Sequence, residues 1–89
     1  MNHIATFILI GQVTTVESLT SKPGKSYVKL SIYAGETTET HVLFFGKVAD
    51  EARQLSSRIV TIAGKVAFKS RGQYTDTSLI GDSISAINT

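Results

Sequence analysis

The sequence predicts an all-β fold with one short helix, in which five strands close into a barrel. Most of the chain consists of short segments where β-branched and apolar residues alternate with polar ones, as on half-buried strands. Only residues 47–55 place apolar side chains at helical spacing. With 89 residues, 42% of them hydrophobic, the chain has room for one core, and we expect residues 1–89 to form a single domain.

The first half of the chain is expected to hold three strands. Residues 4–16 are dense in β-branched and apolar side chains and predict a long first strand, bent near Gly11. A turn containing Pro and Gly at residues 21–24 precedes a second strand at residues 26–34. A polar loop then leads to a third strand at residues 39–45. The second strand alternates cleanly, with Tyr27, Lys29, Ser31 and Tyr33 on one face and Val28, Leu30, Ile32 and Ala34 on the other.

The second half is expected to hold the helix and two more strands. Residues 47–55 have acidic side chains near their start and Arg53 near their end, as the helix dipole favours. A fourth strand follows at residues 58–69, and a hairpin turn leads to a returning strand at residues 74–80. Residues 83–87 form a short closing segment.

Strands with one apolar and one mixed face can remove their exposed edges by closing into a barrel. Five strands with a helix between the third and the fourth are the OB-fold arrangement. We therefore predict a five-stranded OB-fold barrel.

Charge is nearly balanced overall but unevenly distributed. Nine basic and seven acidic side chains give a formal charge of +2, which does not by itself indicate a nucleic-acid ligand. Residues 53–71, however, contain no acid and carry five basic side chains, namely Arg53, Arg58, Lys65, Lys69 and Arg71. Such a stripe could contact phosphates, but on charge alone a solvated strand surface is the favoured interpretation.

Several classes of function find no support in the residues. The absence of cysteine excludes disulfides and thiolate metal sites and fits a reducing cytoplasm. The two histidines, His3 and His41, lie far apart, and no carboxylate pair, nucleophile or phosphate-binding loop is recognisable. We therefore expect no enzyme activity, no metal and no cofactor. The longest apolar run is short, so we expect neither a membrane span nor a signal peptide.

Specific residues add a family resemblance. Residues 40–49, THVLFFGKVA, resemble the third strand and helix start of bacterial-type single-stranded DNA-binding proteins, where a V-x-F-G-K-x-A-like stretch occurs. Residues 8–11, ILIG, are similar to the opening of that family, and residues 26–34 to its second strand. Gly64 with the basic strand after it resembles the fourth strand, QYTDT at residues 73–77 resembles the start of the fifth, and Ile84 with Ile87 resembles its hydrophobic ending. The matches run in the family's order across nearly the whole chain.

The resemblance implies an OB fold that binds single-stranded DNA with little sequence preference, in replication, recombination or repair. It also implies a homodimer or homotetramer assembled through the first strands, with replication proteins as possible partners. Two departures stand out: the chain has no tryptophan, which the family usually carries on its binding surface, and it stops at Thr89 without an acidic tail. These departures suggest a reduced member of phage or plasmid origin, or one like primosomal replication protein N, in the cytoplasm of a bacterial cell or a phage-infected host.

The expected binding face interleaves rings that stack on bases with cations that follow the phosphates. The second strand offers such a face, and family register places Leu43 on the corresponding face of the third. The candidate contacts are Tyr27, Lys29, Tyr33, His41, Phe45, Lys47, Lys65, Lys69, Arg71 and Tyr74.

Each candidate has a simpler explanation. Of the adjacent rings Phe44 and Phe45, one must leave the barrel interior, although the helix or a second subunit could cover it. Tyr27 and Tyr33 could be oligomer contacts, and Tyr74 could pack. His41 could be an ordinary surface histidine, and each lysine could be a solvated charge. Phe7 and Phe68 are assigned to the core or to an interface. We expect binding that weakens steeply with salt and that is weaker than in family members that carry tryptophan, unless several subunits engage one strand. RNA is an alternative ligand, and an OB-fold adaptor that binds replication proteins is an alternative function.

Overall fold

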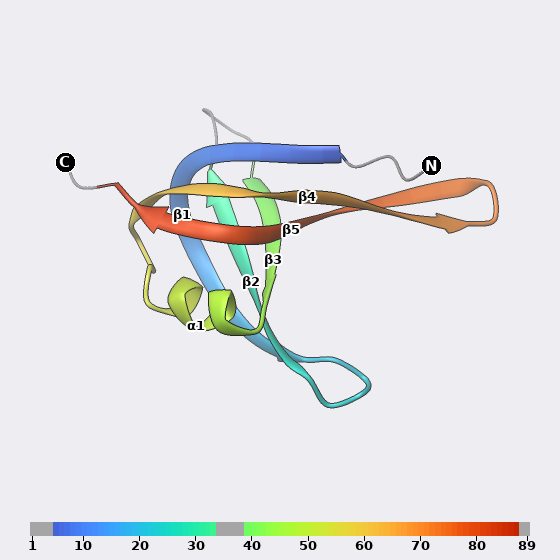
Figure 1. Cartoon of the computed structure of the whole chain (residues 1–89), viewed down its shortest axis with the longest axis horizontal. Helices are drawn as coiled ribbons and strands as arrows, with labels where there is room; N and C mark the ends of the chain where they lie inside the picture. The colour runs from blue at the N-terminus through green and yellow to red at the C-terminus, as the bar shows by residue number, and fades with distance from the viewer. Residues whose placement is uncertain (1–4, 34–38, 88–89) are drawn as a thin grey trace.

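A computed structural model describes residues 5–33 and 39–87 of the chain, apart from the side chains of Lys69 and Arg71. Figure 1 shows a barrel with one short helix, which confirms the predicted fold class. In chain order the elements are β1 (Ala5–Thr20), β2 (Ser26–Tyr33), β3 (Glu39–Phe45), α1 (Lys47–Arg53), β4 (Ile59–Arg71) and β5 (Tyr74–Ala86).

The barrel closes in the order β1-β2-β3-β5-β4, with β4 returning to β1. All neighbouring strands are antiparallel except β3 and β5, which run parallel over a short stretch. Strand β1 is shared between two neighbours, because residues 5–12 pair with β4 and residues 12–20 pair with β2. Its strong curvature in Figure 1 agrees with the expected bend. At Gly11 a Cβ atom would lie 2.3 Å from the carbonyl oxygen of Tyr33, so a side chain there would block this close approach.

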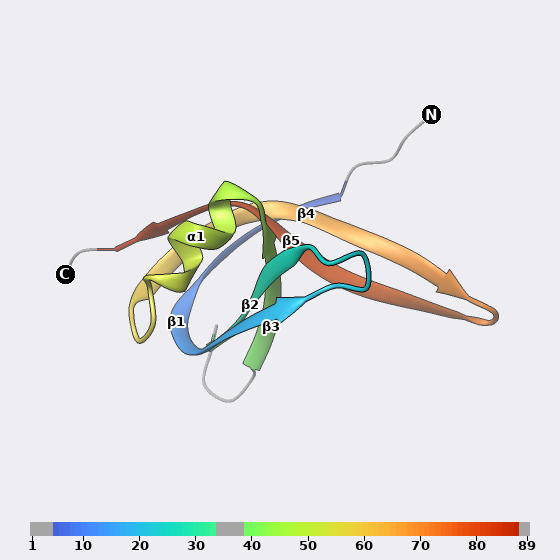
Figure 2. The ribbon, with the colours of Figure 1, turned by 90° about the horizontal axis from the view of Figure 1, so that it is seen from below.

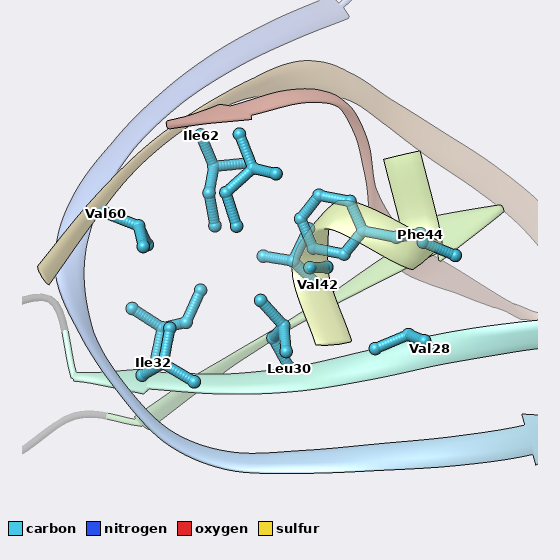
Figure 3. Close-up of a cluster of buried hydrophobic side chains, with 11 residues drawn as sticks. Val28, Leu30, Ile32, Val42, Phe44, Val60 and Ile62 are labelled. Atoms are coloured by element: carbon cyan, nitrogen blue, oxygen red, sulfur yellow. The ribbon is translucent and has the colours of Figure 1, made fainter. Parts of the chain in front are cut away.

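The core fills the barrel interior with the apolar face of each strand (Figure 3). Its largest fully buried side chains are Phe44, Leu30, Ile32, Ile62, Val13, Val28, Val42 and Val60. The Phe44 ring packs against Gly81 of β5, where a Cβ atom would come within 2.1 Å of the ring. Glycine at position 81 therefore makes the space that the largest core side chain occupies.

Helix α1 covers one end of the barrel (Figures 1 and 2). It starts after Gly46, whose φ of 67° suits glycine, and buries Ala49 and Ala52. Arg53 in its last turn forms an ion pair with Asp50 and donates a hydrogen bond from Nε to Ser18 Oγ of β1 at 3.3 Å. The helix is thus tied to the long first strand as well as to the core.

Several boundaries differ from the expected ones. Strand β1 continues to Thr20, because its polar end pairs with the start of β2. Strand β5 is one strand of 13 residues, not two segments, because a register shift opposite residues 63 and 64 absorbs one residue without breaking the ladder. The helix ends at Arg53, two residues early, and β4 runs from Ile59 to Arg71. The expected strand residues Ile4 and Ala34 lie outside the described residues.

Candidate nucleic-acid interface

The outer faces of β2 and β3 form one surface, which we call the β2–β3 face. Because directly paired residues of antiparallel strands share a face, the register places its members opposite one another. The four pairs are Tyr27 with Phe45, Lys29 with Leu43, Ser31 with His41, and Tyr33 with Glu39. Five of the ten candidate contacts from the sequence therefore lie together: Tyr27, Lys29, Tyr33, His41 and Phe45.

An aromatic stack marks one end of this face. The rings of Tyr27 and Phe45 lie with their centroids 5.3 Å apart and their planes 23° from parallel. Phe45 is 43% exposed whereas its neighbour Phe44 is fully buried, so the two rings point to opposite sides of β3 as alternation requires. Tyr33, at the other end of β2, is 44% exposed. The face therefore presents aromatic surface at both ends of β2.

A hydrogen-bonded cluster occupies the middle of the face. Ser31 Oγ lies 3.0 Å from His41 Nδ1, and this hydrogen bond gives the buried serine hydroxyl a partner. On its other side His41 Nε2 lies 4.0 Å from Glu39 Oε1, while Thr14 Oγ1 donates to Glu39 Oε2 at 3.2 Å. The imidazole is thus hydrogen-bonded through Nδ1, with the Glu39 carboxylate near its other nitrogen, and that carboxylate accepts a hydrogen bond from β1.

Charge on this face is mixed. Lys29 is half-buried and lies between Leu43 on β3 and Glu17 on β1 in the strand register. Glu39 adds a second acid near the opposite end. Any phosphate contact made here must therefore compete with two nearby carboxylates, so the face offers more stacking surface than positive charge.

A groove runs along the edge of the face, between β3 and β5. It has a volume of about 410 Å³. One wall comes from Lys29, His41 and Leu43, and the other comes from Thr77, Ser78 and Leu79. Glu39 and Thr40 lie at one end of it. The groove places polar and aliphatic groups beside one lysine and one carboxylate, next to the Tyr27–Phe45 stack.

The other five candidates are not on this face. Lys47 is exposed in the first turn of α1, two residues after Phe45. Lys65 is exposed on β4, paired with Thr6 and Ile80. Tyr74 is 75% exposed at the start of β5, and the backbones of Lys69 and Arg71 pair with Asp76 and Tyr74. The basic stretch of β4 therefore lies on the β4–β5 hairpin and not beside Lys29.

Two features of the groove were missed by the sequence reasoning. Thr77 and Leu79 line its second wall. Phe68, which pairs with Thr77, is 64% exposed and so is not a core residue, while its assignment to an interface stays a prediction. Alternation assigned Phe68 to the inward face correctly, but β4 and β5 are longer than β3 and continue beyond the barrel. The length of the predicted fourth strand, residues 58–69, was the available signal, because an inward face beyond the barrel has no core to cover it.

Other chemistry finds little support in the described part of the chain. No group of three or more His, Cys, Asp or Glu residues there could hold a metal ion. The described residues also include no helix of sufficient length and hydrophobicity to cross a membrane.

Sequence comparisons find no matching family model and no curated relative. Structural comparison finds the mitochondrial single-stranded DNA-binding protein Rim1 of S. cerevisiae. One crystal form superimposes with a TM-score of 0.79 at 17% identity, covering 96% of this chain and 97% of Rim1. A second form gives a TM-score of 0.76 at 18% identity, covering 97% and 96%. At this level of identity the likeness shows a shared fold, which extends over nearly the whole of both chains.

Proposed function

We propose that this chain binds single-stranded DNA with little sequence preference, by stacking bases on the β2–β3 face. The observation that carries the proposal is the exposed Tyr27–Phe45 stack, with Lys29 and the groove beside it. Bases of any identity stack on aromatic rings, so such a surface needs no base-specific hydrogen bonds. The OB barrel shared with Rim1, described as a single-stranded DNA-binding protein, supports the same function.

Stacking contributes more to this proposal than phosphate contacts do. The cations near the face are Lys29 and Lys47, with Lys65 on the hairpin, and two acids lie close to Lys29. One to three phosphate contacts per chain would give a salt slope of about −0.7 to about −2.1 for a single strand. Affinity should then fall by about 3- to 18-fold between about 50 mM and about 200 mM salt.

The test is a titration of the protein with oligothymidine at both salt concentrations. Binding at low salt with the shallow slope given above supports the proposal. No binding at low salt contradicts it, and a much steeper slope shows that phosphate contacts dominate over stacking. The same titration with oligouridine tests the choice between DNA and RNA, which the stacking surface itself leaves open.

We further propose that the chain works as a homodimer or homotetramer. The outer face of β1 and β4 carries Ile8, Ile10 and Ile59, which are 76%, 58% and 42% exposed. The register places Ile8 beside Ala63, and Ile10 beside Thr61, so these side chains form one apolar surface, which we call the β1–β4 face. Monomers rarely leave such a surface open. It shares no residue with the β2–β3 face, and joining several binding faces on one strand would raise the affinity.

The proposed setting is DNA replication, recombination or repair, in the cytoplasm of a bacterial cell or a phage-infected host and without catalysis by this chain. A second candidate is an OB-fold adaptor that acts through protein contacts, for which the β1–β4 face would be the docking surface. Measuring the mass of the assembly with and without oligothymidine separates the two. A self-association that persists and takes up DNA supports the first candidate, whereas a monomer without DNA affinity supports the adaptor.

A further inference from the structure

Strands β3 and β5 pair over a short stretch and separate toward their first residues (Figure 1). In the described sheet their pairing is limited to residues 42–43 of β3 and residues 79–80 of β5. Residues 39–41 and residues 77–78 are therefore not paired with each other, and the groove lies between them. Backbone groups on these two facing edges are left for water or for a ligand.

Glu39 lies at one end of this groove, on the outward face of β3. Its side chain is 40% exposed. Tyr33, which is also exposed, pairs directly with Glu39, so an aromatic ring lies beside the carboxylate on the same face. A nucleic-acid strand that stacks on this ring therefore passes close to Glu39.

The carboxylate of Glu39 keeps acceptor capacity for a ligand, because a carboxylate offers about four lone-pair sites. Its Oε2 atom lies 3.2 Å from Thr14 Oγ1, but this hydroxyl has a single proton and also lies 3.0 Å from the carbonyl oxygen of Ser31. Its Oε1 atom lies 4.0 Å from His41 Nε2, which is too long for a hydrogen bond. These contacts leave lone pairs free to accept from a donor in the groove.

Bases differ in what they would present to such an acceptor. Cytosine carries the N4 amino group, from which a carboxylate accepts a hydrogen bond. Thymine carries the O4 acceptor at the same place on its edge, and a carboxylate repels it. We propose that Glu39 makes one position of the groove selective for a base with an exocyclic amino group, such as cytosine, over thymine.

This inference depends on the proposed function, because it concerns one base of the same single strand. The Tyr27–Phe45 stack accepts bases of any identity, so the preference is confined to the position at Glu39. The groove volume of about 410 Å³ lies within the range of about 300–1,000 Å³ that is typical of small-ligand sites.

The other polar groups of the groove do not favour one base. The hydroxyls of Thr40, Thr77 and Ser78 can donate or accept, and a neutral imidazole at His41 can do the same. Lys29 only donates, but it pairs with Leu43, four residues after Glu39 and about 13 Å further along β3. Discrimination between amino and carbonyl groups at the Glu39 end therefore depends on the carboxylate.

Oligodeoxycytidine and oligothymidine of equal length test the preference, because both bases are pyrimidines of similar size. The titrations are made at about 200 mM salt, where screening weakens the repulsion between Glu39 and the phosphates. Glu39→Gln keeps the shape of the side chain and removes its charge. It should weaken oligodeoxycytidine binding relative to oligothymidine binding by about 2- to 13-fold, the range for one net hydrogen bond. Glu39→Ala should shift this ratio in the same direction, and urea unfolding checks that both variants are folded.

Glu17→Gln is the matched control. Glu17 is exposed and lies beside Lys29 in the strand register, but it does not line the groove. Removing its charge should change the affinity for both oligonucleotides by the same factor and leave their ratio at the parent value. Oligodeoxyuridine is a second control, because uracil has the O4 atom of thymine without the methyl group. It should rank with oligothymidine.

Three results would overturn the inference. The first is a ratio of the two affinities that is the same in the parent and in Glu39→Gln. The second is an equal change of the ratio in Glu17→Gln, which would make the effect one of charge alone. The third is oligodeoxyuridine that ranks with oligodeoxycytidine, because the thymine methyl group would then set the preference.

The same titrations distinguish failure of this inference from failure of the proposed function. A parent that binds none of these oligonucleotides at low salt contradicts the proposed function. A parent that binds them all, with a ratio that Glu39→Gln leaves unchanged, refutes only the role of Glu39.

Discussion

Replacing Phe45 with alanine separates a binding role from a structural one. The ring is 43% exposed and packs on Tyr27 alone among the described rings, so its removal forfeits an aromatic pair that contributes about 0.5–1.5 kcal/mol. In the complex the same ring would support a stacked base, which contributes about 1–3 kcal/mol. We therefore expect a variant that remains folded and binds oligothymidine about 5- to 160-fold more weakly.

The assay is a fluorescence anisotropy titration with labelled oligothymidine at low salt, alongside urea unfolding and a mass measurement. Phe44→Ala is the contrasting variant, because the same ring on the buried side should cost about 3–5 kcal/mol of stability. Phe45→Trp is the conservative variant and should bind at least as well as the parent. A Phe45→Ala variant with unchanged stability, mass and affinity would refute the stacking surface.

A double-mutant cycle tests whether Tyr27 and Phe45 act as one platform. If one base stacks on the pair, Tyr27→Ala and Phe45→Ala together should weaken binding by less than the product of their separate effects. Residues in contact show coupling energies of about 0.5–3 kcal/mol, well above the error of a titration. Strictly multiplicative effects would mean that the two rings hold different bases.

Three further predictions concern the groove, the core and the assembly. Glu39→Gln removes a carboxylate from the groove end and should tighten oligothymidine binding about two- to fivefold at low salt. The gain in affinity should shrink as the salt concentration rises. An equal gain at high salt would contradict the electrostatic cause. Gly81→Ala pushes a Cβ atom into the Phe44 ring and should lower the free energy of unfolding by about 1–3 kcal/mol in urea titration; unchanged stability would show that the ring moves without strain. The double variant Ile8→Lys with Ile10→Lys places charges on the β1–β4 face and should convert the assembly to monomers, as measured by light scattering. A mass equal to that of the parent would contradict the proposed interface.

Local patterns in the sequence predicted the parts of the fold that depend on local geometry. Alternation in residues 26–33 predicted the two faces of β2 correctly, and the adjacent pair Phe44 and Phe45 required one ring to point outward. These predictions succeeded because side-chain direction along a strand repeats every two residues, whatever the rest of the chain does.

The features of the fold that the sequence did not predict depend on contacts between distant segments. Residues 17–20 of β1 show no strong strand pattern, yet they form a ladder with residues 26–29 of β2. The continuity of β5 past Gly81 likewise depends on pairing with β4, which residues 81–83 do not reveal by themselves. The exposure of Phe68 was missed because alternation predicts its face but not where the barrel ends, for which the length of the predicted fourth strand was the one local signal.

The sharing of β1 between two neighbours has a kinetic consequence. Its C-terminal half pairs with β2 across a short turn, and β4 pairs with β5 in the same local way. Its N-terminal half instead meets β4 more than 45 residues along the chain, where Gln12 pairs with Ile59 and Ala5 with Val66. Contacts between distant segments carry a larger loop-closure entropy and slow the folding of β proteins. The two hairpins are therefore expected to form first, and the pairing of the N-terminal half of β1 with β4 is expected to form later.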